Sequence, residues 1–156
     1  MQIHIVAVGG RVPAWANSGF DEYAKRMPGH CRVRLHEVPA GRRTKGSAIA
    51  RLIDQECKRL IALTPKGCQT IALERTGQRI DTELLAVALR SWLNDGQDIA
   101  FWIGGPEGLA PDCIEHADKV WSLSALTFAH PLVRVLVAEQ LYRAWSIVHG
   151  HPYHRG

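Results

Sequence analysis

Residues 99–108 read IAFWIGGPEG, an apolar run that stops at a cluster of glycines. Five apolar residues of β-branched, aromatic and small types predict a buried strand. The glycines predict a turn in which backbone N–H groups can approach a ligand, because no Cβ stands in the way. A plain tight turn is the alternative. The spacing matches neither the G-x-G-x-x-G of dinucleotide-binding loops nor a P-loop, since no Gly-Lys-Ser or Gly-Lys-Thr occurs.

Similar strand and helix units lie on both sides of this stretch. Strands are predicted at 3–8, 31–38, 69–73, 99–103 and 120–123. Helices are predicted at 20–27, from a Ser47 cap to about 63, from an Asp81 or Thr82 cap to about 94, at 111–117 and at 131–148. This alternation predicts an α/β fold, a mostly parallel sheet with helices on both faces. No repeat or linker interrupts it, so we expect one domain over residues 1–156.

Two sets of apolar residues are predicted to form the core. The stripe on the helix after Ser47 and the tryptophans of the second half belong to them, and the residues are Ile49, Leu52, Ile53, Leu60, Leu63, Trp92, Trp102, Trp121 and Trp145.

Composition excludes several classes of protein. Of the 156 residues, 46% are hydrophobic and 22% charged, which excludes disordered, collagen-like and coiled-coil chains. The net charge is +4, yet residues 1–66 hold 12 Lys and Arg against 5 Asp and Glu. This basic half indicates either a polyanionic partner or a solvated face.

Cysteine spacing and terminal sequence indicate the compartment. The 4 cysteines form no C-x-x-C pair, so we expect free thiols in a reducing environment. Neither a signal segment nor an apolar run long enough for a membrane span is found, which favours a cytoplasmic protein.

Three further segments are candidates for chemistry. Residues 123–131 form an apolar loop with two hydroxyls, suited to a purine and a thioether or simply a buried crossover. The basic loop at 39–46 contains Arg42, Arg43 and Lys45, which contact either a polyanion or only solvent. The tail at 149–155 holds three histidines, but its Gly and Pro make a metal site a poor interpretation. A frayed end and a tail ordered against RNA, with Tyr153 on a base and Arg155 on a phosphate, are the alternatives.

Taken together, these motifs resemble one known family. The quoted stretches are IGGPEGL at 103–109, SLSALT at 122–127, HPLVRV at 130–135 and HPYHR at 151–155, with VAVG at 6–9 and PAGRR at 39–43. Four motifs in this order, across the whole chain, resemble the RlmH (YbeA) family of SPOUT-class methyltransferases. One departure is Ala129, where the family pattern has Pro before the histidine.

The resemblance implies both a fold and an activity. It implies an α/β knot, with a C-terminal trefoil knot, and a homodimer whose partner subunit completes the RNA site. It also implies methyl transfer from S-adenosyl-L-methionine to N3 of a pseudouridine in 23S, large-subunit ribosomal RNA. The cofactor pocket it implies consists of Leu73, Gly104, Gly105, Leu123, Ser124, Ala125, Leu126, Thr127 and Phe128.

Methyl transfer from a sulfonium needs no metal, but the acceptor N3–H must lose its proton. Glu139, His130 and His154 are the candidate proton acceptors, with Glu139 and His154 preferred. Glu139 has a structural alternative, since it can pair with Arg134 or Arg143 on the same helix. The residues expected to contact RNA are Arg42, Arg43, Lys45, His130, Tyr153 and Arg155. Two other functions stay open at this point: a non-catalytic ribosome- or RNA-binding module, and a small-molecule enzyme.

Overall fold

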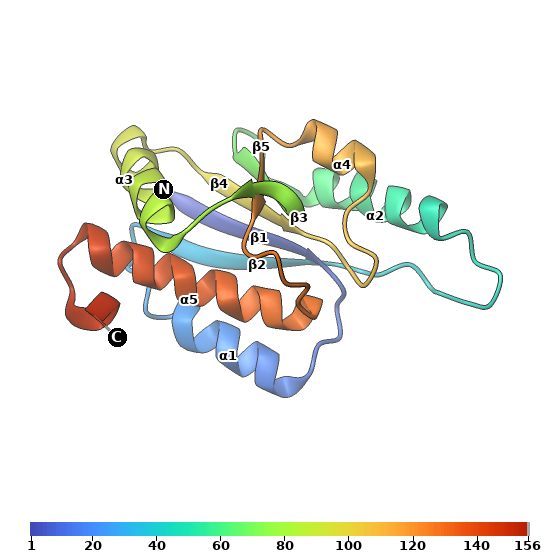
Figure 1. Ribbon diagram of the computed structural model, residues 1–156, viewed down its shortest axis with the longest axis horizontal. Helices are drawn as coiled ribbons and strands as arrows, with labels where there is room; N and C mark the ends of the chain where they lie inside the picture. The colour runs from blue at the N-terminus through green and yellow to red at the C-terminus, as the bar shows by residue number, and fades with distance from the viewer. Residues whose placement is uncertain (156) are drawn as a thin grey trace.

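The computed structural model describes residues 1–155, and its centre is a five-stranded sheet in the order β2-β1-β4-β3-β5 (Figure 1). The strands are β1 (Gln2–Val8), β2 (Arg32–Val38), β3 (Gln69–Arg79), β4 (Ile99–Ile103) and β5 (Lys119–Ser122). All four strand pairs are parallel, which confirms the predicted sheet.

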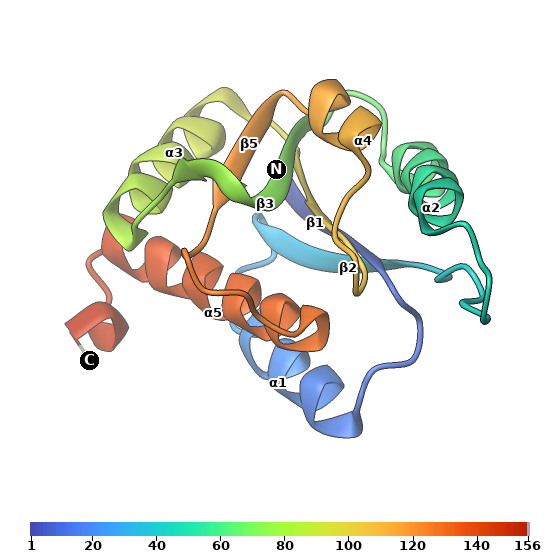
Figure 2. The ribbon, with the colours of Figure 1, turned by 45° about the vertical axis from the view of Figure 1, so that its right-hand side comes forward.

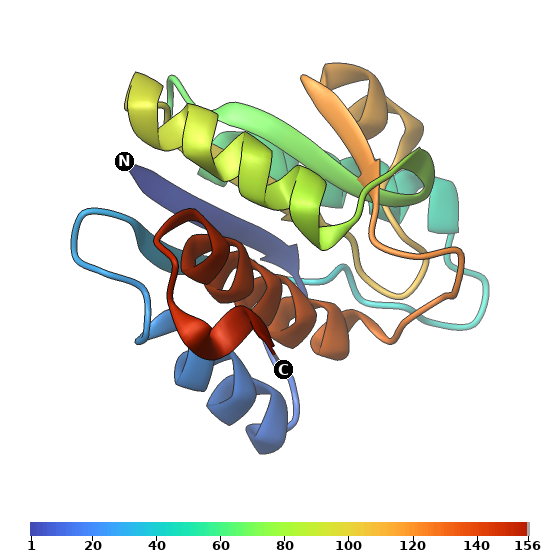
Figure 3. The same cartoon turned by 60° about the vertical axis from the view of Figure 1, so that its left-hand side comes forward.

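Helices cover both faces of this sheet, as predicted. Their bounds are α1 (Ala14–Ala24), α2 (Ile49–Leu63), α3 (Thr82–Asp95), α4 (Pro111–His116) and α5 (His130–Val148), followed by the 3-10 helix η1 (Pro152–Arg155). Figure 2 shows α2 and α4 on one face and α1 and α5 on the other. In Figure 3, α3 lies beside α5 on that second face.

Side chains of β1 point alternately to the two faces of the sheet, where they join two separate apolar cores. Ile3 and Ile5 point toward α1, α3 and α5, whereas Val6 and Val8 point toward α2 and α4, and all four are at most 1% exposed. A strand buried on both faces needs a nearly continuous apolar sequence, which is what the sequence provides. The core prediction is confirmed for Trp92, Trp102 and Trp121, while Trp145 is only partly buried.

The start of α2 differs from the prediction. Ala48 occupies the N-cap and makes no side-chain cap, because the Ser47 hydroxyl instead accepts a hydrogen bond from the Thr44 N–H at 2.7 Å. The apolar stripe was also partly wrong, since Ile49 and Leu63 are 38% and 43% exposed. Leu60 is buried as predicted, and Glu56 and Cys57 share the buried face with it.

Two other boundaries differ as well. The helix α1 ends at Ala24 rather than continuing to 27, and it begins earlier, at Ala14. β3 continues past the predicted end at 73 to Arg79, through a register shift against β5. Gly77 permits this, because a Cβ there would lie 2.7 Å from the carbonyl oxygen of Val120.

Three further predictions concern the cysteines, membrane-spanning segments and the knot. All four cysteines are free, as expected. Within residues 1–155, no helix combines the length and apolarity that a membrane crossing requires. The trefoil knot stays a prediction from the family resemblance.

Candidate functional site

A cavity of about 350 Å³ opens beside the middle of β3 and the carboxyl ends of β4 and β5. This size lies within the range of small-molecule sites, and its position is where open α/β sheets bind ligands. The lining comes from the middle of β3, the end of β4 with the loop after it, the loop after β5 and the first turn of α5, and consists of Leu73, Glu74, Arg75, Ile103, Gly104, Gly105, Pro106, Glu107, Gly108, Leu123, Ser124, Leu126, Thr127, Phe128, His130 and Val133. Eight of the nine predicted cofactor residues are among them, and the exception is the exposed Ala125.

The loop after β4 closes on itself through backbone contacts. The Gly108 N–H donates to the carbonyl of Gly105 at 3.0 Å. Gly108 has a φ of +80°, in the left-handed region that favours glycine. A Cβ on Gly104 would lie 2.7 Å from both the Gly108 oxygen and the Leu109 nitrogen. Only glycine at these positions lets the loop close this tightly, and the same loop forms one wall of the cavity.

The loop between β5 and α5 is ordered by its own hydroxyls. Ser122 Oγ donates to the Ser124 carbonyl at 2.9 Å, and Ser124 Oγ accepts from the Leu126 N–H at 3.0 Å. Leu126 lines the cavity and yet is 69% exposed. An exposed large apolar side chain at a cavity offers a hydrophobic surface to a ligand.

His130 is the first residue of α5, and it lines the cavity. Burial lowers its pKa from 6.5, and the neighbouring cations of Arg134 and Arg43 lower the pKa further, while Glu107 opposes them. Arg134 itself is 1% exposed; it donates to the Gly9 carbonyl and to Glu37 Oε2, the latter at 3.2 Å. The imidazole is therefore neutral at pH 7 and can accept a proton.

Glu139 lies farther along α5, outside the cavity lining. Its Oε1 accepts from Arg143 Nη2 at 2.6 Å and from the Tyr153 hydroxyl at 3.0 Å, and its Oε2 accepts from Gln140 at 2.8 Å. Of the two structural alternatives, the pairing with Arg143 is present, whereas Arg134 pairs with Glu37. Nine residues of helix separate Glu139 from His130, a rise of about 13 Å.

The tail folds back onto the far end of α5 (Figure 1). The Tyr153 ring packs 4.6 Å from the Tyr142 ring, with the Arg143 guanidinium 4.9 Å from its centroid. Burial raises the pKa of Tyr153, and the Glu139 carboxylate raises it further. His154 is partly buried and Arg155 exposed, and neither lines the cavity. The structure thus gathers Glu139 and the tail into one cluster, and places His130 alone of the candidate bases at the cavity.

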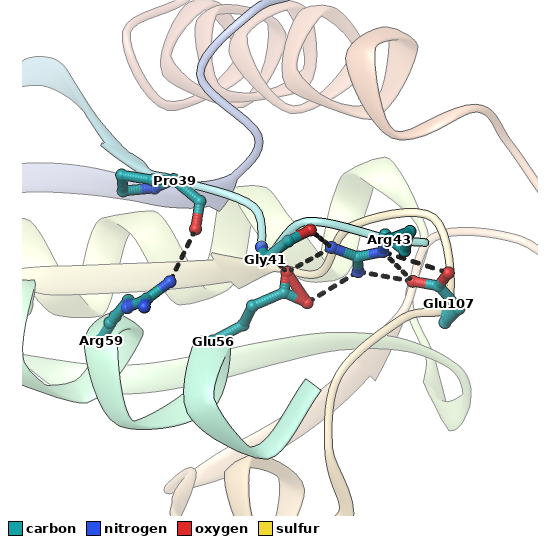
Figure 4. Close-up of polar contacts among 6 residues, drawn as sticks. All are labelled: Pro39, Gly41, Arg43, Glu56, Arg59 and Glu107. Carbon is teal, nitrogen blue, oxygen red and sulfur yellow. Dashed lines mark hydrogen bonds and ion pairs between the residues drawn. The ribbon is translucent and has the colours of Figure 1, made fainter. Parts of the chain in front are cut away.

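The basic loop divides into two kinds of arginine. Arg42 and Lys45 are exposed, as a contact with RNA requires. Arg43 instead lies between the carboxylates of Glu56 and Glu107 (Figure 4). Sequence reasoning missed both partners, although a glutamate in phase with Leu52 and Leu60 was a signal for the first. It also missed the cavity residues Arg75 and Val133.

No group of three or more His, Cys, Asp or Glu within residues 1–155 is arranged to hold a metal ion.

Comparison with known proteins agrees with this geometry. A family described as "Predicted SPOUT methyltransferase" matches residues 1–154, nearly the whole chain. The chain belongs to the SPOUT methyltransferase family. This confirms the resemblance inferred from the motifs.

Curated relatives and a solved structure extend the comparison. The chain is 50% identical to "Ribosomal RNA large subunit methyltransferase H" from Thioalkalivibrio sulfidiphilus over 155 residues, 99% of each protein. It is 52% identical to the protein of the same name from Alkalilimnicola ehrlichii, again over 99% of each. A crystal structure of a probable methyltransferase from Bordetella pertussis has a TM-score of 0.57 at 16% identity, covering 91% of this chain and 95% of that one. At that identity the last likeness concerns the SPOUT fold alone.

Proposed function

We propose that this SPOUT-family chain methylates N3 of a pseudouridine in large-subunit ribosomal RNA, with S-adenosyl-L-methionine as the methyl donor. The observation that carries the proposal is the convergence of three separate segments, the middle of β3 and the loops after β4 and β5, with eight of nine expected residues, on one cavity. The name shared by two full-length relatives supports ribosomal RNA as the substrate. Such a substrate places the reaction in the cytoplasm.

The cavity residues fit this donor. Leu73, Leu126 and Phe128 offer apolar walls to an adenine ring and a thioether. Arg43 lowers the pKa of Glu107, so the cavity presents an ionised carboxylate to a cationic ligand. When bound, S-adenosyl-L-methionine supplies a methyl group already activated by its positive sulfur.

The chain's own task is to position the reactants and to take up a proton. Loop closure at Gly104 and Gly108 fixes one wall of the donor site, and orientation of this kind is a large part of catalysis. We assign proton acceptance from the pseudouridine N3–H to His130, because it is neutral and lines the cavity. Glu139 orients the tail by accepting from Tyr153.

The active unit we propose is a homodimer. Within one chain, Glu139 lies about 13 Å along α5 from His130, and the tail that it bonds through Tyr153 lines no part of the cavity. A second copy can place its Tyr153, His154 and Arg155 at the cavity of the first. Arg42 and Lys45 are exposed, and we assign them to phosphate contacts.

The test is a methyl-transfer assay on three substrates. Purified protein and radiolabelled S-adenosyl-L-methionine are incubated with ribosomes, free subunits or naked RNA from a strain that lacks the enzyme. We expect label on N3 of a pseudouridine in large-subunit RNA, identified by mass spectrometry of the nucleosides. Donor binding with no label on any RNA refutes the acceptor. Ribosome binding with neither label nor donor binding supports the non-catalytic module instead.

A further inference from the structure

Arg43 makes more hydrogen bonds than any other side chain of the basic loop, and every one of its N–H groups has an acceptor within the protein. Its Nη1 donates to the Gly41 carbonyl at 2.7 Å and to Glu56 at 3.1 Å. Its Nη2 donates to Glu56 at 2.8 Å and to Glu107 at 2.6 Å, and its Nε donates to Glu107 at 3.1 Å. A guanidinium has five N–H donors, so all five are occupied. No donor is left for a phosphate, although the sequence predicted that Arg43 contacts RNA.

The two carboxylates differ in how firmly they are held. Glu56 lies on α2 with its side chain 3% exposed, and it also accepts from the Gly41 N–H at 3.3 Å. Glu107 lies on the glycine loop, is 31% exposed and lines the cavity. Arg43 therefore links a fixed, buried anchor to a loop at the surface (Figure 4).

Close packing fixes the position of this link. A Cβ on Gly41 would lie 2.8 Å from Leu52 Cδ2, so the basic loop presses directly on α2. A Cβ on Gly105 would lie 3.8 Å from Arg43 Nη2, so the guanidinium lies near the glycine loop as well as bonding Glu107 on it.

We propose that Arg43 is a positioning residue that holds the Gly104–Gly108 loop at the cavity and couples order in the basic loop to methyl-donor binding. Whatever binds against the glycine loop then stabilises the basic loop with its exposed Arg42 and Lys45, and the converse holds because coupling is reciprocal. The inference rests on the proposed function for the identity of the donor. The positioning role of Arg43 between Glu56 and Glu107, which we call the brace, rests on the ion pairs alone.

A lysine at position 43 separates a brace from a phosphate contact. Lysine keeps the positive charge that a phosphate requires, but its compact ammonium cannot bond two carboxylates side by side. We expect Arg43→Lys to raise the dissociation constant for S-adenosyl-L-methionine about tenfold, while ribosome affinity stays within about twofold. Because Arg43→Ala would leave the buried Glu56 carboxylate without a cation, the second variant is Arg43→Met with Glu56→Gln, expected to weaken donor binding equally.

Arg59→Ala is the matched control. Arg59 lies on α2, as Glu56 does, and donates one hydrogen bond to the Pro39 carbonyl at 3.3 Å. It therefore contacts the basic loop without touching Glu107 (Figure 4). Its loss removes a cation and a loop contact, and we expect the donor dissociation constant to change less than twofold.

Hydrogen exchange supplies a readout that needs no catalysis. In the free protein, we expect amides of residues 104–110 to exchange about tenfold faster in Arg43→Lys than in the unmodified chain. On adding S-adenosyl-L-methionine, residues 39–47 should become protected in the unmodified chain but not in the variant. Unchanged exchange at 104–110, or a lysine variant that loses only ribosome affinity, overturns the brace. If the unmodified chain binds no donor, the proposed function fails, whereas exchange in the free protein still tests the brace.

Discussion

At Gly104, adding one methyl group by Gly104→Ala should impair methyl-donor binding while the protein still folds. A Cβ added there would lie 2.7 Å from the Gly108 oxygen and 2.7 Å from the Leu109 nitrogen. Ordinary non-bonded separations are about 3.5 Å, so the facing backbone must move by nearly 1 Å. Both neighbours are main-chain atoms, and no side chain can swing away to relieve the contact.

The size of the effect follows from that displacement. Overpacking a well-packed site costs about 1–3 kcal/mol, which for a domain of this size lowers Tm by about 3–9 °C. A shift of about 1 Å in a positioning element costs on the order of 100-fold in rate. We therefore expect Gly104→Ala to remain folded but to transfer methyl about 100-fold more slowly, with weaker donor binding.

The assay is single-turnover methyl transfer to ribosomes, with calorimetry of S-adenosyl-L-methionine binding and a thermal melt on the same preparation. Gly10→Ala is the control, because a Cβ at Gly10 would meet nothing within 4 Å. We expect that variant to match the unmodified protein in all three measurements. A folded Gly104→Ala that binds donor and transfers methyl within twofold of the unmodified protein would refute the assignment of this loop.

Three further predictions address the cap of α3, the strand histidines and the tail. Asp81→Ala removes the side chain that caps α3 by accepting a backbone N–H at 2.8 Å, so we expect a loss of about 1 kcal/mol of stability by chemical denaturation. His4 and His36 hydrogen bond at 2.9 Å, and burial foremost lowers the pKa of both below 6.5, so the unfolded chain binds more protons below that pH. Stability should therefore fall as pH drops below about 6.5, and His36→Gln should flatten that slope; an unchanged slope would contradict the reasoning. Tyr153→Phe removes the hydroxyl bond to Glu139, and we expect slower methyl transfer with an unchanged donor dissociation constant, measured by calorimetry. Weaker donor binding in that variant would place the tail at the donor site instead.

Strands were predictable because their signal is local. Ile99–Ile103 is a fully apolar run that stops at a glycine, and the strand occupies those residues. In a parallel sheet buried on both faces, the central strands are nearly continuous apolar runs, so the pattern has few rivals.

Helix faces were less predictable. On α3 the sequence offers several neighbouring apolar residues, and periodicity alone does not select among them. Leu85 and Leu89 are buried, whereas Val87 is 71% exposed. On α2 the charged Glu56 lies in the buried face, since Arg43 in the loop just before the helix neutralises it.

In the candidate site too, features with a local sequence signal were predictable and contacts between separate segments were not. Its glycine loop and apolar loop were found from their own sequences, because each follows a strand at the edge where ligands bind. The Arg43–Glu107 ion pair joins residues 64 positions apart, and no local pattern indicates such a pair. Likewise, nothing in the tail sequence indicated that Tyr153 would turn back onto Glu139.

The central claim is that the cavity of one chain and the tail of another form a single active site. A mixture of two strongly impaired variants, Gly104→Ala in the cavity loop and Arg155→Ala in the tail, tests it directly. In the mixed dimer, the intact cavity of the tail variant meets the intact tail of the cavity variant. The account predicts that methyl transfer to ribosomes, reduced about 100-fold or more in either variant alone, returns on mixing to about a quarter of the unmodified rate, since half the dimers are mixed and each holds one whole site. A mixture that stays inactive, although exchange into mixed dimers is shown by mass spectrometry, would contradict it.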